Sequence, residues 1–429
     1  MSHVRSAETC DVVVVGGGLA GLAAGATAAA AGASTIVLER HRPGGRARTT
    51  ERDGFLFNQG AHALYVGGAG MPVLKSLGVR PVGSAPPLRR YRLLAGGTLH
   101  PMPSRLTSPE RTSAAGPRGR LQLARFLADI PHLRADRLRG RSVRQWLAGL
   151  ELRPDAEAVV RALLRLTTYV ADVDEFGADV VAEQLRVSLG GVLYLNGGWA
   201  QLVEALARQV QIRSGTAVRA LEAVAGRVEV HTDGPSIVAR AAVVAPGTPV
   251  AARAVLPLAP AWPGLGEAVT AACLDVGARQ VPSPEYVLGV ETPVYGNTQS
   301  PPARLAPGGG AVLSVVRYGA RSAAEDRPEL DAHLGVLGVG AEHVVTSRFL
   351  ARMVVAAALP RAAAGGLAGR PAVTDSGTAG VYLAGDWVGA VGWLADASLA
   401  SGQTAALQAL RRLGLATSGP EVPGLAITS

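Results

Sequence analysis

The stretch "DVVVVGGGLAGLAAGATAAAAGASTIVLER", residues 11–40, decides the fold. A run of valines leads into a glycine cluster, then an alanine-rich segment, and then a second apolar run. This pattern predicts a strand Val12–Val15, a turn Gly16–Gly18, a helix Leu19–Ala31 and a strand Thr35–Leu38. Because the first strand is apolar throughout, it indicates a parallel sheet that is covered on both faces.

Three glycines in the turn, Gly16, Gly18 and Gly21, fit the spacing G-x-G-x-x-G. Gly16 permits the tight turn, Gly18 lets a pyrophosphate approach the backbone, and Gly21 lets helix and strand pack closely. Glu39 stands at the end of the second strand, about twenty residues past the motif, where a carboxylate binds the ribose of adenosine. The motif therefore predicts a dinucleotide site, and a carboxylate at this place disfavours NADP.

Phosphate binding is also expected from the start of the helix and from a second loop. Leu19 and Ala20 open the helix, whose free N–H groups and positive partial charge attract an anion. Gly44, Gly45 and Arg46 combine a flexible loop with a guanidinium, which is a second place to hold phosphate.

The composition of the chain bounds the remaining possibilities. With 429 residues, 48% of them hydrophobic and 17% charged, the chain is long enough for two or three globular domains. The net charge of +9 comes from arginines, since Lys75 is the only lysine, and these arginines are scattered. A nucleic-acid partner is therefore not expected. Cys10 and Cys273 fit no metal spacing, so we expect no metal site. Two distant cysteines and a polar start, which does not resemble a signal peptide, indicate a cytoplasmic protein.

The order of the segments predicts two interleaved domains. Residues from about 70 to 190 have leucines and arginines at helical spacing, and residues 210–247 contain four short strands that we interpret as a meander. The chain closes with "GVYLAGDWVG" and a helix from about Ala395 to Leu413. We expect a cofactor domain made of residues 1–70, 196–268 and 366–429, and a substrate domain, partly helical, made of residues 71–195 and 269–365.

Several motifs together give the chain a family resemblance. They are "GGGLAG" with Glu39, "GGRART", "GFLFNQGAH", "GGWAQLVEAL", "AVVAPG" and "LAGDW…ASLASGQTAA". In this combination the chain resembles the flavin-containing amine oxidase superfamily, which also holds protoporphyrinogen oxidase and the phytoene and carotene desaturases. The resemblance implies an α/β fold: a Rossmann-like FAD-binding domain of the glutathione-reductase type with a β-meander, and a mixed α+β substrate domain with a helical part.

The resemblance also implies how FAD would be held, and because no cysteine stands in the closing motif, we expect no covalent bond to it. The glycine turn would bind its pyrophosphate, Glu39 its ribose, Arg46 the phosphates and ribityl side, and Val218 its adenine. Asp386 would take the ribityl chain or order water, and the last helix would aim its amino end at the flavin ring. The full set of residues expected to contact FAD is Gly16, Gly18, Leu19, Ala20, Gly21, Glu39, Arg40, Gly44, Gly45, Arg46, Gly60, Ala61, His62, Val218, Gly385, Asp386, Leu394 and Ala397.

Few side chains are candidates for catalysis, because a flavin performs the redox step itself. His62 and Trp393 are the candidates for the substrate pocket, and each has an alternative structural interpretation: a hydrogen-bonded histidine and a core tryptophan. Asp396 is interpreted as the N-cap of the last helix. Tyr65, Tyr295 and Tyr318 are pocket candidates by location only.

The chain departs from the amine oxidases in two respects that bear on the substrate: the lysine near the flavin is missing, and the paired aromatic cage is incomplete, because Leu394 follows Trp393. Those enzymes place a lysine near flavin N5, whereas Lys75 lies far too early in this chain. We therefore expect a desaturase-like FAD-dependent oxidoreductase that dehydrogenates an apolar small molecule by hydride transfer to N5. The alternatives are an amine or amino-acid oxidase with a non-standard site and a flavin-dependent isomerase.

The partners follow from the same interpretation. The electron acceptor would be oxygen, a quinone or another acceptor, and the sequence leaves the oligomeric state open. Leucines with arginines between them in "LARFLADIPHLRADRLRG", residues 123–140, fit either core packing or peripheral contact with a membrane.

Overall fold

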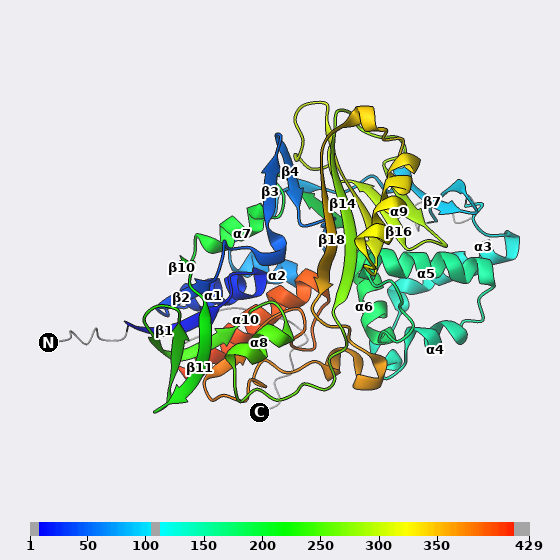
Figure 1. Ribbon diagram of the computed structural model, residues 1–429. Helices are drawn as coiled ribbons and strands as arrows, with labels where there is room; N and C mark the ends of the chain where they lie inside the picture. The colour runs from blue at the N-terminus through cyan, green and yellow to red at the C-terminus, as the bar shows by residue number, and fades with distance from the viewer. Residues whose placement is uncertain (1–7, 104–111, 416–429) are drawn as a thin grey trace.

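The computed structural model describes residues 8–103 and 112–415, and two large sheets dominate it (Figure 1). The polar start of the chain, residues 1–7, and the chain end after residue 415 lie outside the described residues. The first sheet lies at the lower left of Figure 1 and the second runs upright through the centre. This mixed α/β architecture agrees with the fold class that the sequence predicts.

The first sheet is built around the predicted strand–turn–helix–strand unit. β1 (Glu8–Val15) pairs in parallel with β2 (Thr35–Glu39) on one side and with β13 (Ile237–Val244) on the other. The sheet order is β10-β2-β1-β13-β12-β11, and β19 pairs with β13. Its remaining strands are β10 (Gln211–Ser214), β11 (Val218–Val224), β12 (Arg227–Thr232) and β19 (Val381–Leu383).

The predicted meander is wrong at its first strand. β10 pairs in parallel with β2 at the opposite edge of the sheet, so only β11, β12 and β13 form an antiparallel series. Sequence spacing alone could not distinguish the two arrangements, because a short strand after a helix can return to either edge.

Two helices from opposite ends of the chain pack together on this sheet. They are α1 (Leu19–Ala30) and α10 (Leu394–Arg412). A Cβ on Gly402 would overlap the backbone oxygen of Ala20, so glycine is required where the helices cross. This crossing brings the glycine turn and the closing motif of the sequence to one end of the sheet (Figure 1).

The second sheet has the order β18-β14-β17-β16-β15-β7-β8. Its strands are β7 (Tyr91–Ala95), β8 (Thr98–Pro101), β14 (Val269–Ala278), β15 (Tyr286–Gly289), β16 (Val294–Thr298), β17 (Ala311–Tyr318) and β18 (Val344–Ala356). The prediction of helix for the region of β7 and β8 is wrong, because "LLAGGTLH" forms a hairpin with a two-glycine turn.

Helices cover the two faces of the second sheet differently. α9 (Ala323–Val336) packs on one face through an aliphatic cluster that includes Leu274 and Leu330. The other face meets the helical part of the substrate region through a cluster that includes Cys273 and Leu164. The helices of that part are α3 (Pro117–Asp129), α4 (Val143–Ala148), α5 (Pro154–Thr168) and α6 (Ala178–Ser188).

Smaller elements surround or connect the two sheets. They are η1 (Gly45–Ala47), β3 (Thr49–Arg52), β4 (Phe55–Asn58), β5 (Leu64–Tyr65), α2 (Gly70–Ser76), β6 (Gly83–Ser84), β9 (Val192–Leu195), α7 (Ala200–Ala207) and α8 (Pro249–Val255). The domain boundaries given by the sequence analysis stay a prediction.

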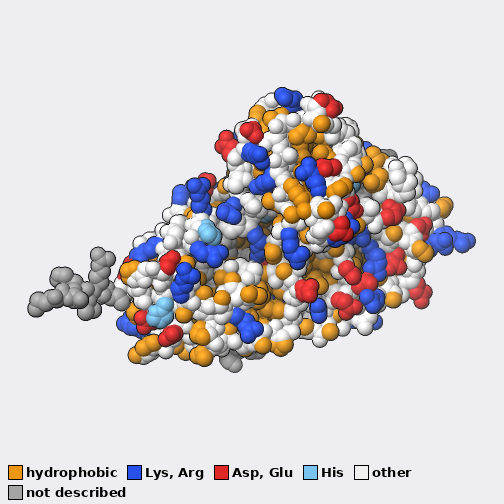
Figure 2. Space-filling view, in the orientation of Figure 1, with side chains coloured by type: hydrophobic (Ala, Val, Ile, Leu, Met, Phe, Trp, Pro, Cys, Tyr) orange, Lys and Arg blue, Asp and Glu red, His pale blue; other side chains and the backbone are white. Residues whose placement is uncertain are grey.

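The surface bears on the predicted partners. Basic, acidic and apolar side chains are interspersed on the face in Figure 2, which has no continuous basic stripe. Leu123 and Leu127 of the leucine–arginine segment are buried in the core, as core packing requires. Among residues 8–103 and 112–415, no helix combines the length and apolar character needed to cross a membrane. Peripheral membrane contact stays a prediction.

Candidate functional site

The glycine turn has the geometry that each of its glycines was predicted to need. Gly16 has a φ of +101°, which a side chain would strain, and Gly21 packs so closely that a Cβ would overlap the Gly16 oxygen. Gly18 is extended, with a φ of −75°, and a Cβ on it would meet no atom within 4 Å. Glycine at 16 and 21 is therefore required by the fold, whereas the bare face of Gly18 is open to a ligand.

The first turn of α1 presents backbone N–H donors beside the open face of Gly18. Its N-cap is Gly18, which has no side chain, so no side-chain bond caps the helix. The first N–H groups of a helix have no partner within it, and Leu19 and Ala20 contribute two of them. An uncapped helix start beside an open backbone face fits a phosphate group, so the residues present fit the pyrophosphate of FAD.

Glu39 is anchored beside the turn. One carboxylate oxygen accepts a 2.7 Å hydrogen bond from the Gly17 N–H, and the other accepts one of 2.7 Å from the His41 N–H. The Thr216 N–H donates to the backbone oxygen of Glu39, which brings Val218, at the start of β11, to the same end of the sheet. Arg40 is exposed and donates to the His41 ring.

The loop of Gly44, Gly45 and Arg46 lies against the glycine turn. The Gly44 N–H donates to Gly17 O at 2.7 Å, and η1 then aims Arg46 at Asp386. Two guanidinium nitrogens of Arg46 donate to the two oxygens of Asp386 at 2.7 and 2.8 Å. The two residues were each expected to contact FAD, and the structure joins them to one another in a bidentate ion pair.

Asp386 is almost fully buried and has further support. The Ala357 N–H donates to it at 3.0 Å, so the carboxylate accepts three hydrogen bonds in all. Gly385 before it has a φ of +154°, and its N–H donates to the Ser401 hydroxyl of α10 at 2.9 Å. The closing motif is thus bonded both to the Arg46 loop and to the last helix.

The start of α10 differs from the sequence prediction. The helix begins at Leu394, which has a φ of +56°, an unusual value for a leucine, and Ala397 is buried in its first turn. Asp396 is not the N-cap, since that position belongs to Trp393; instead its carboxylate accepts a 2.8 Å bond from the Gly70 N–H. Burial raises the pKa of Asp396 to about 6.

His62 follows a turn that packs against the second sheet. Gly60 has a φ of +82° and lies under the Met353 sulfur, and Ala61 is half-buried. His62 Nδ1 lies 3.1 Å from Gly60 O, and the imidazole contacts the Trp199 ring edge-on at 4.9 Å. Burial lowers the pKa of His62, so it is held as the neutral form, with Nδ1–H donating to the carbonyl.

Trp393 lies in the core between α10 and the helical part. Its indole N–H donates to Thr168 O at 3.0 Å, and its ring lies 5.1 Å from that of Phe176. Trp393 is thus a core tryptophan, which is the structural alternative that the sequence allowed. Its role in a substrate pocket stays a prediction. Among the described residues, no hydrogen bond or ring contact joins it to His62.

A tyrosine cluster occupies the face of the second sheet that meets the helical part. Six of the eight tyrosines of the chain pack into this core. They are Tyr91, Tyr169, Tyr194, Tyr286, Tyr295 and Tyr318. The rings of Tyr91 and Tyr286 stack at 4.4 Å, and those of Tyr169 and Tyr318 meet edge-on at 5.4 Å. The buried hydroxyls of Tyr286 and Tyr318 have no hydrogen-bond partner.

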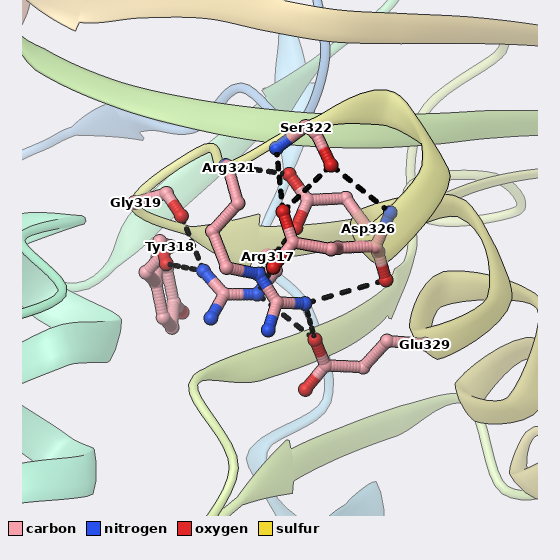
Figure 3. Close-up of polar contacts among 8 residues, drawn as sticks. Arg317, Tyr318, Gly319, Arg321, Ser322, Asp326 and Glu329 are labelled. Carbon is pink, nitrogen blue, oxygen red and sulfur yellow. Dashed lines mark hydrogen bonds and ion pairs between the residues drawn. The ribbon is translucent and has the colours of Figure 1, made fainter.

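An ion network fixes the backbone at Tyr318 (Figure 3). Arg317 donates to Tyr318 O at 2.9 Å and also to Gly319 O, while its Nε donates to Glu329 at 2.9 Å. Arg321 donates to the fully buried Asp326 at 2.8 Å. The network joins the end of β17 to the start of α9, and so it holds Tyr318 at a fixed place in the tyrosine cluster.

A second buried polar network crosses the same sheet face. Asp275 on β14 accepts bonds from Arg348 at 2.5 and 3.2 Å, from the Ser314 hydroxyl at 2.6 Å and from the Cys273 thiol at 3.3 Å. Gln299 donates to Ser314 at 3.1 Å and so extends the network toward β4. The carboxylate of Asp275 is therefore neutralised and saturated with donors.

Sequence reasoning missed most of this face. Trp199, four of the six clustered tyrosines and the pair of Asp275 and Arg348 were not singled out. One signal was available, because an aspartate inside the apolar strand sequence "AACLDVGA", residues 271–278, has to find a charged partner when buried. The partner itself, 73 residues further along the chain, has no sequence signal.

The fold and the site define a class of protein, the flavin-binding proteins, in which the glycine turn and the closing helix form the nucleotide-binding part of the fold. The chain matches the family model of flavin-containing amine oxidoreductases over residues 19–410, so it belongs to that family. It is a flavin-dependent oxidoreductase, and its cofactor is FAD.

Similarity to individual proteins covers most of the chain for a solved structure and only short segments for the curated relatives. A solved oxidoreductase from Methanosarcina mazei matches 93% of this chain and all of its own, with a TM-score of 0.74 and 18% identity. Coproporphyrinogen III oxidase from Propionibacterium freudenreichii subsp. freudenreichii is 41% identical over 101 residues, 23% of this chain and 19% of its own. A component of the limonene dehydrogenase from Castellaniella defragrans is 49% identical over 67 residues, 15% of this chain and 11% of its own.

The matched segments thus span less than a fifth of the length of these two curated relatives. The solved structure supports the fold alone, because its identity is low. The match over most of the chain establishes the family and its cofactor.

Proposed function

We propose that the protein dehydrogenates an apolar, conjugated or allylic small molecule and transfers the electrons to oxygen, a quinone or another acceptor. The bound flavin would accept a hydride at N5. The protein's part would be to bind the substrate by shape and exclusion of water, and to orient it against the flavin.

One observation carries this proposal. The carboxylate of Asp275 lies on the sheet face with the tyrosine cluster, but its oxygens already accept hydrogen bonds and cannot also bind the ammonium group of an amine. That carboxylate is already paired with Arg348 and bonded to Ser314 and Cys273. A buried cation needs a partner, and aromatic rings alone would compensate little of its desolvation. Flat apolar substrates, in contrast, need no charged partner and gain from contact with apolar and aromatic side chains.

Two partial relatives are compatible with the proposal. Their names describe oxidation of a porphyrinogen and dehydrogenation of limonene. Neither match covers enough of its relative to transfer a substrate to this chain, so both serve only to choose the compounds for a test.

The test is anaerobic reduction of the enzyme-bound flavin by a panel of candidate substrates. The panel contains porphyrinogens, polyenes, cyclic monoterpenes, steroids, primary amines and amino acids. We expect the visible flavin absorbance to be lost with a member of one apolar class, at a rate that saturates with its concentration. Bleaching by amines alone, with release of ammonia and hydrogen peroxide in air, would overturn the proposal.

The alternative of an amine or amino-acid oxidase rests on the family to which the chain belongs. The matched control for it is the double variant Asp275→Asn/Arg348→Met, which removes both charges of the pair from the sheet face and leaves neither without its partner. An amine substrate that used this carboxylate would lose affinity in the variant, whereas an apolar substrate would bind as before. An isomerase would convert its substrate without any net transfer of electrons to an acceptor.

A further inference from the structure

A second candidate binding site lies away from the glycine turn and the tyrosine cluster. It is an open groove of about 670 Å³ between α7 and the connection from α2 to β6. Three arginines line it: Arg80 from that connection, Arg208 from the end of α7, and Arg304 from the segment between β16 and β17. We call it the arginine groove; Asn196 and Gln201 complete the set of residues that define it.

The walls of the arginine groove are fixed by hydrogen bonds within the protein. Gln201 accepts a 2.6 Å bond from the Val82 N–H and donates to Val82 O and Asn196 O at 3.0 Å. The Asn196 side chain accepts a 2.9 Å bond from the Arg304 N–H. The three lining segments are therefore bonded to one another, and the groove is formed before any ligand binds.

The arginine groove has an unbalanced positive charge. Within the described part of the chain, none of the guanidinium groups of Arg80, Arg208 and Arg304 makes a hydrogen bond or an ion pair. No aspartate or glutamate is among the lining residues either. By contrast, Arg46 and Arg348 at the flavin end and the sheet face are each paired with a buried carboxylate. Like charges that converge in a concave surface attract an anion.

The size and spacing of the arginine groove indicate the kind of anion. Its volume lies within the range of small-molecule sites. Gln201 and Arg208 lie seven residues apart on or at the end of α7, which corresponds to about 10 Å along a helix. Guanidinium forks bind phosphate oxygens in pairs, so three of them along such a groove suit a group with two or more negative charges.

We propose that the arginine groove binds a phosphate- or diphosphate-bearing molecule, either a soluble compound or the headgroup of a phospholipid. Its ligand is distinct from FAD and from the substrate, so the inference goes beyond the proposed function. Because Arg208 follows α7, which packs against α1 of the first-sheet region, and Arg304 lies between two strands of the second sheet, a bound polyanion would stabilise the contact between these two parts.

The test uses the full chain loaded with FAD and then freed of unbound FAD by gel filtration, so that the cofactor site is filled and no free dinucleotide competes for the arginine groove. Inorganic diphosphate is titrated at low ionic strength by calorimetry. We expect one saturable site and a rise of the melting temperature. In the triple variant Arg80→Gln/Arg208→Gln/Arg304→Gln we expect the affinity to fall at least tenfold.

Arg253→Gln is the matched control, since Arg253 is an exposed arginine of α8 without a side-chain partner in the described chain. It should bind diphosphate as the unaltered chain does. A second arm measures sedimentation with vesicles of phosphatidylcholine, with and without phosphatidic acid. Binding to the acidic vesicles that the triple variant loses and Arg253→Gln keeps would identify a headgroup as the ligand.

Two results would overturn the proposal. One is the absence of saturable binding in both arms. The other is equal binding by the unaltered chain and the triple variant while circular dichroism reports the same fold for both. If the triple variant does not fold, the single variant Arg304→Gln replaces it, with an expected loss of affinity of at least threefold.

Discussion

The glycine turn and the tyrosine-bearing sheet face are built in opposite ways. At the turn, the contacts that matter come from the backbone: the φ of Gly16, the open face of Gly18 and the uncapped start of α1. On the sheet face, they come from side chains, such as Asp275 with its donors and the stacked tyrosines.

This difference has consequences for what each region tolerates. A backbone site fails when a Cβ is added and is indifferent to most other changes. A side-chain site depends on pairs of partners, so removing one partner leaves the other buried and unsatisfied. Single substitutions in each region separate the two kinds of dependence.

The largest effect is expected for Gly21→Ala. A Cβ there would overlap Gly16 O, so α1 could not pack on β1, and we expect a loss of about 4 kcal/mol or more of unfolding free energy. Gly18→Ala is the control, because its Cβ would point into open space; it should lose less than about 1 kcal/mol. Denaturant titration of both apoproteins measures the pair. Equal losses would contradict the assignment of a structural role to one glycine and an open face to the other.

The next effect concerns the ion pair that joins the two ends of the chain. Arg46→Met leaves the buried Asp386 with only the bond from Ala357, and we expect a loss of about 3 kcal/mol. Arg48→Met removes an exposed neighbouring arginine and should change stability by less than about 0.5 kcal/mol. Thermal unfolding of both apoproteins gives the comparison. Equal melting temperatures for the two variants would show that the ion pair of Arg46 and Asp386 does not stabilise the fold.

A third effect depends on pH and arises at the start of α10. The pKa of Asp396 is raised from 3.8 to about 6 in the folded chain, so below pH 4 both states are protonated. Between pH 4 and 6 only the unfolded state has released the proton, so the unfolding free energy falls as the pH rises, by at most about 3 kcal/mol.

Asp396→Asn should remove this fall, because an amide oxygen can still accept from the Gly70 N–H without titrating. The measurement is the denaturation midpoint of the apoprotein between pH 4 and 7, for the unaltered chain and the variant. Parallel pH profiles for the two chains would show that another group is responsible.

The smallest effect is expected in the tyrosine cluster. Tyr318→Phe removes a buried hydroxyl that has no partner, so stability should stay within about 0.5 kcal/mol or rise slightly. Tyr65→Phe is the comparison, since its hydroxyl donates to Thr167 O at 3.0 Å and its loss should cost about 1 kcal/mol. If Tyr318→Phe costs more than Tyr65→Phe, the Tyr318 hydroxyl has a partner, such as an ordered water, that matters to the fold.

The same difference explains what the sequence could predict. The strand, turn and helix from Val12 to Leu38 were predicted to within a few residues, because a backbone motif is contiguous and its glycine spacing is dictated by sterics. The family, the FAD cofactor and the α/β fold followed from that motif together with the closing one.

What could not be predicted depends on distant partners or on choices between edges of a sheet. The edge taken by β10 and the hairpin of β7 and β8 were missed, because short apolar runs do not state which sheet they join. Arg46 and Asp386 were each assigned to the cofactor, and their mutual pairing across 340 residues has no sequence signal. The N-cap at Asp396 was wrong, because the helix starts earlier, at the strained Leu394.

The central claim is that the open backbone face at Gly18, together with the closing segment around Asp386, holds FAD. The most direct test is the flavin content of purified Gly18→Val after incubation with excess FAD and gel filtration. We expect one FAD for each unaltered chain and a loss of at least tenfold in the variant, whose apoprotein keeps its circular dichroism and melting temperature. A variant that binds FAD as tightly as the unaltered chain would contradict the account.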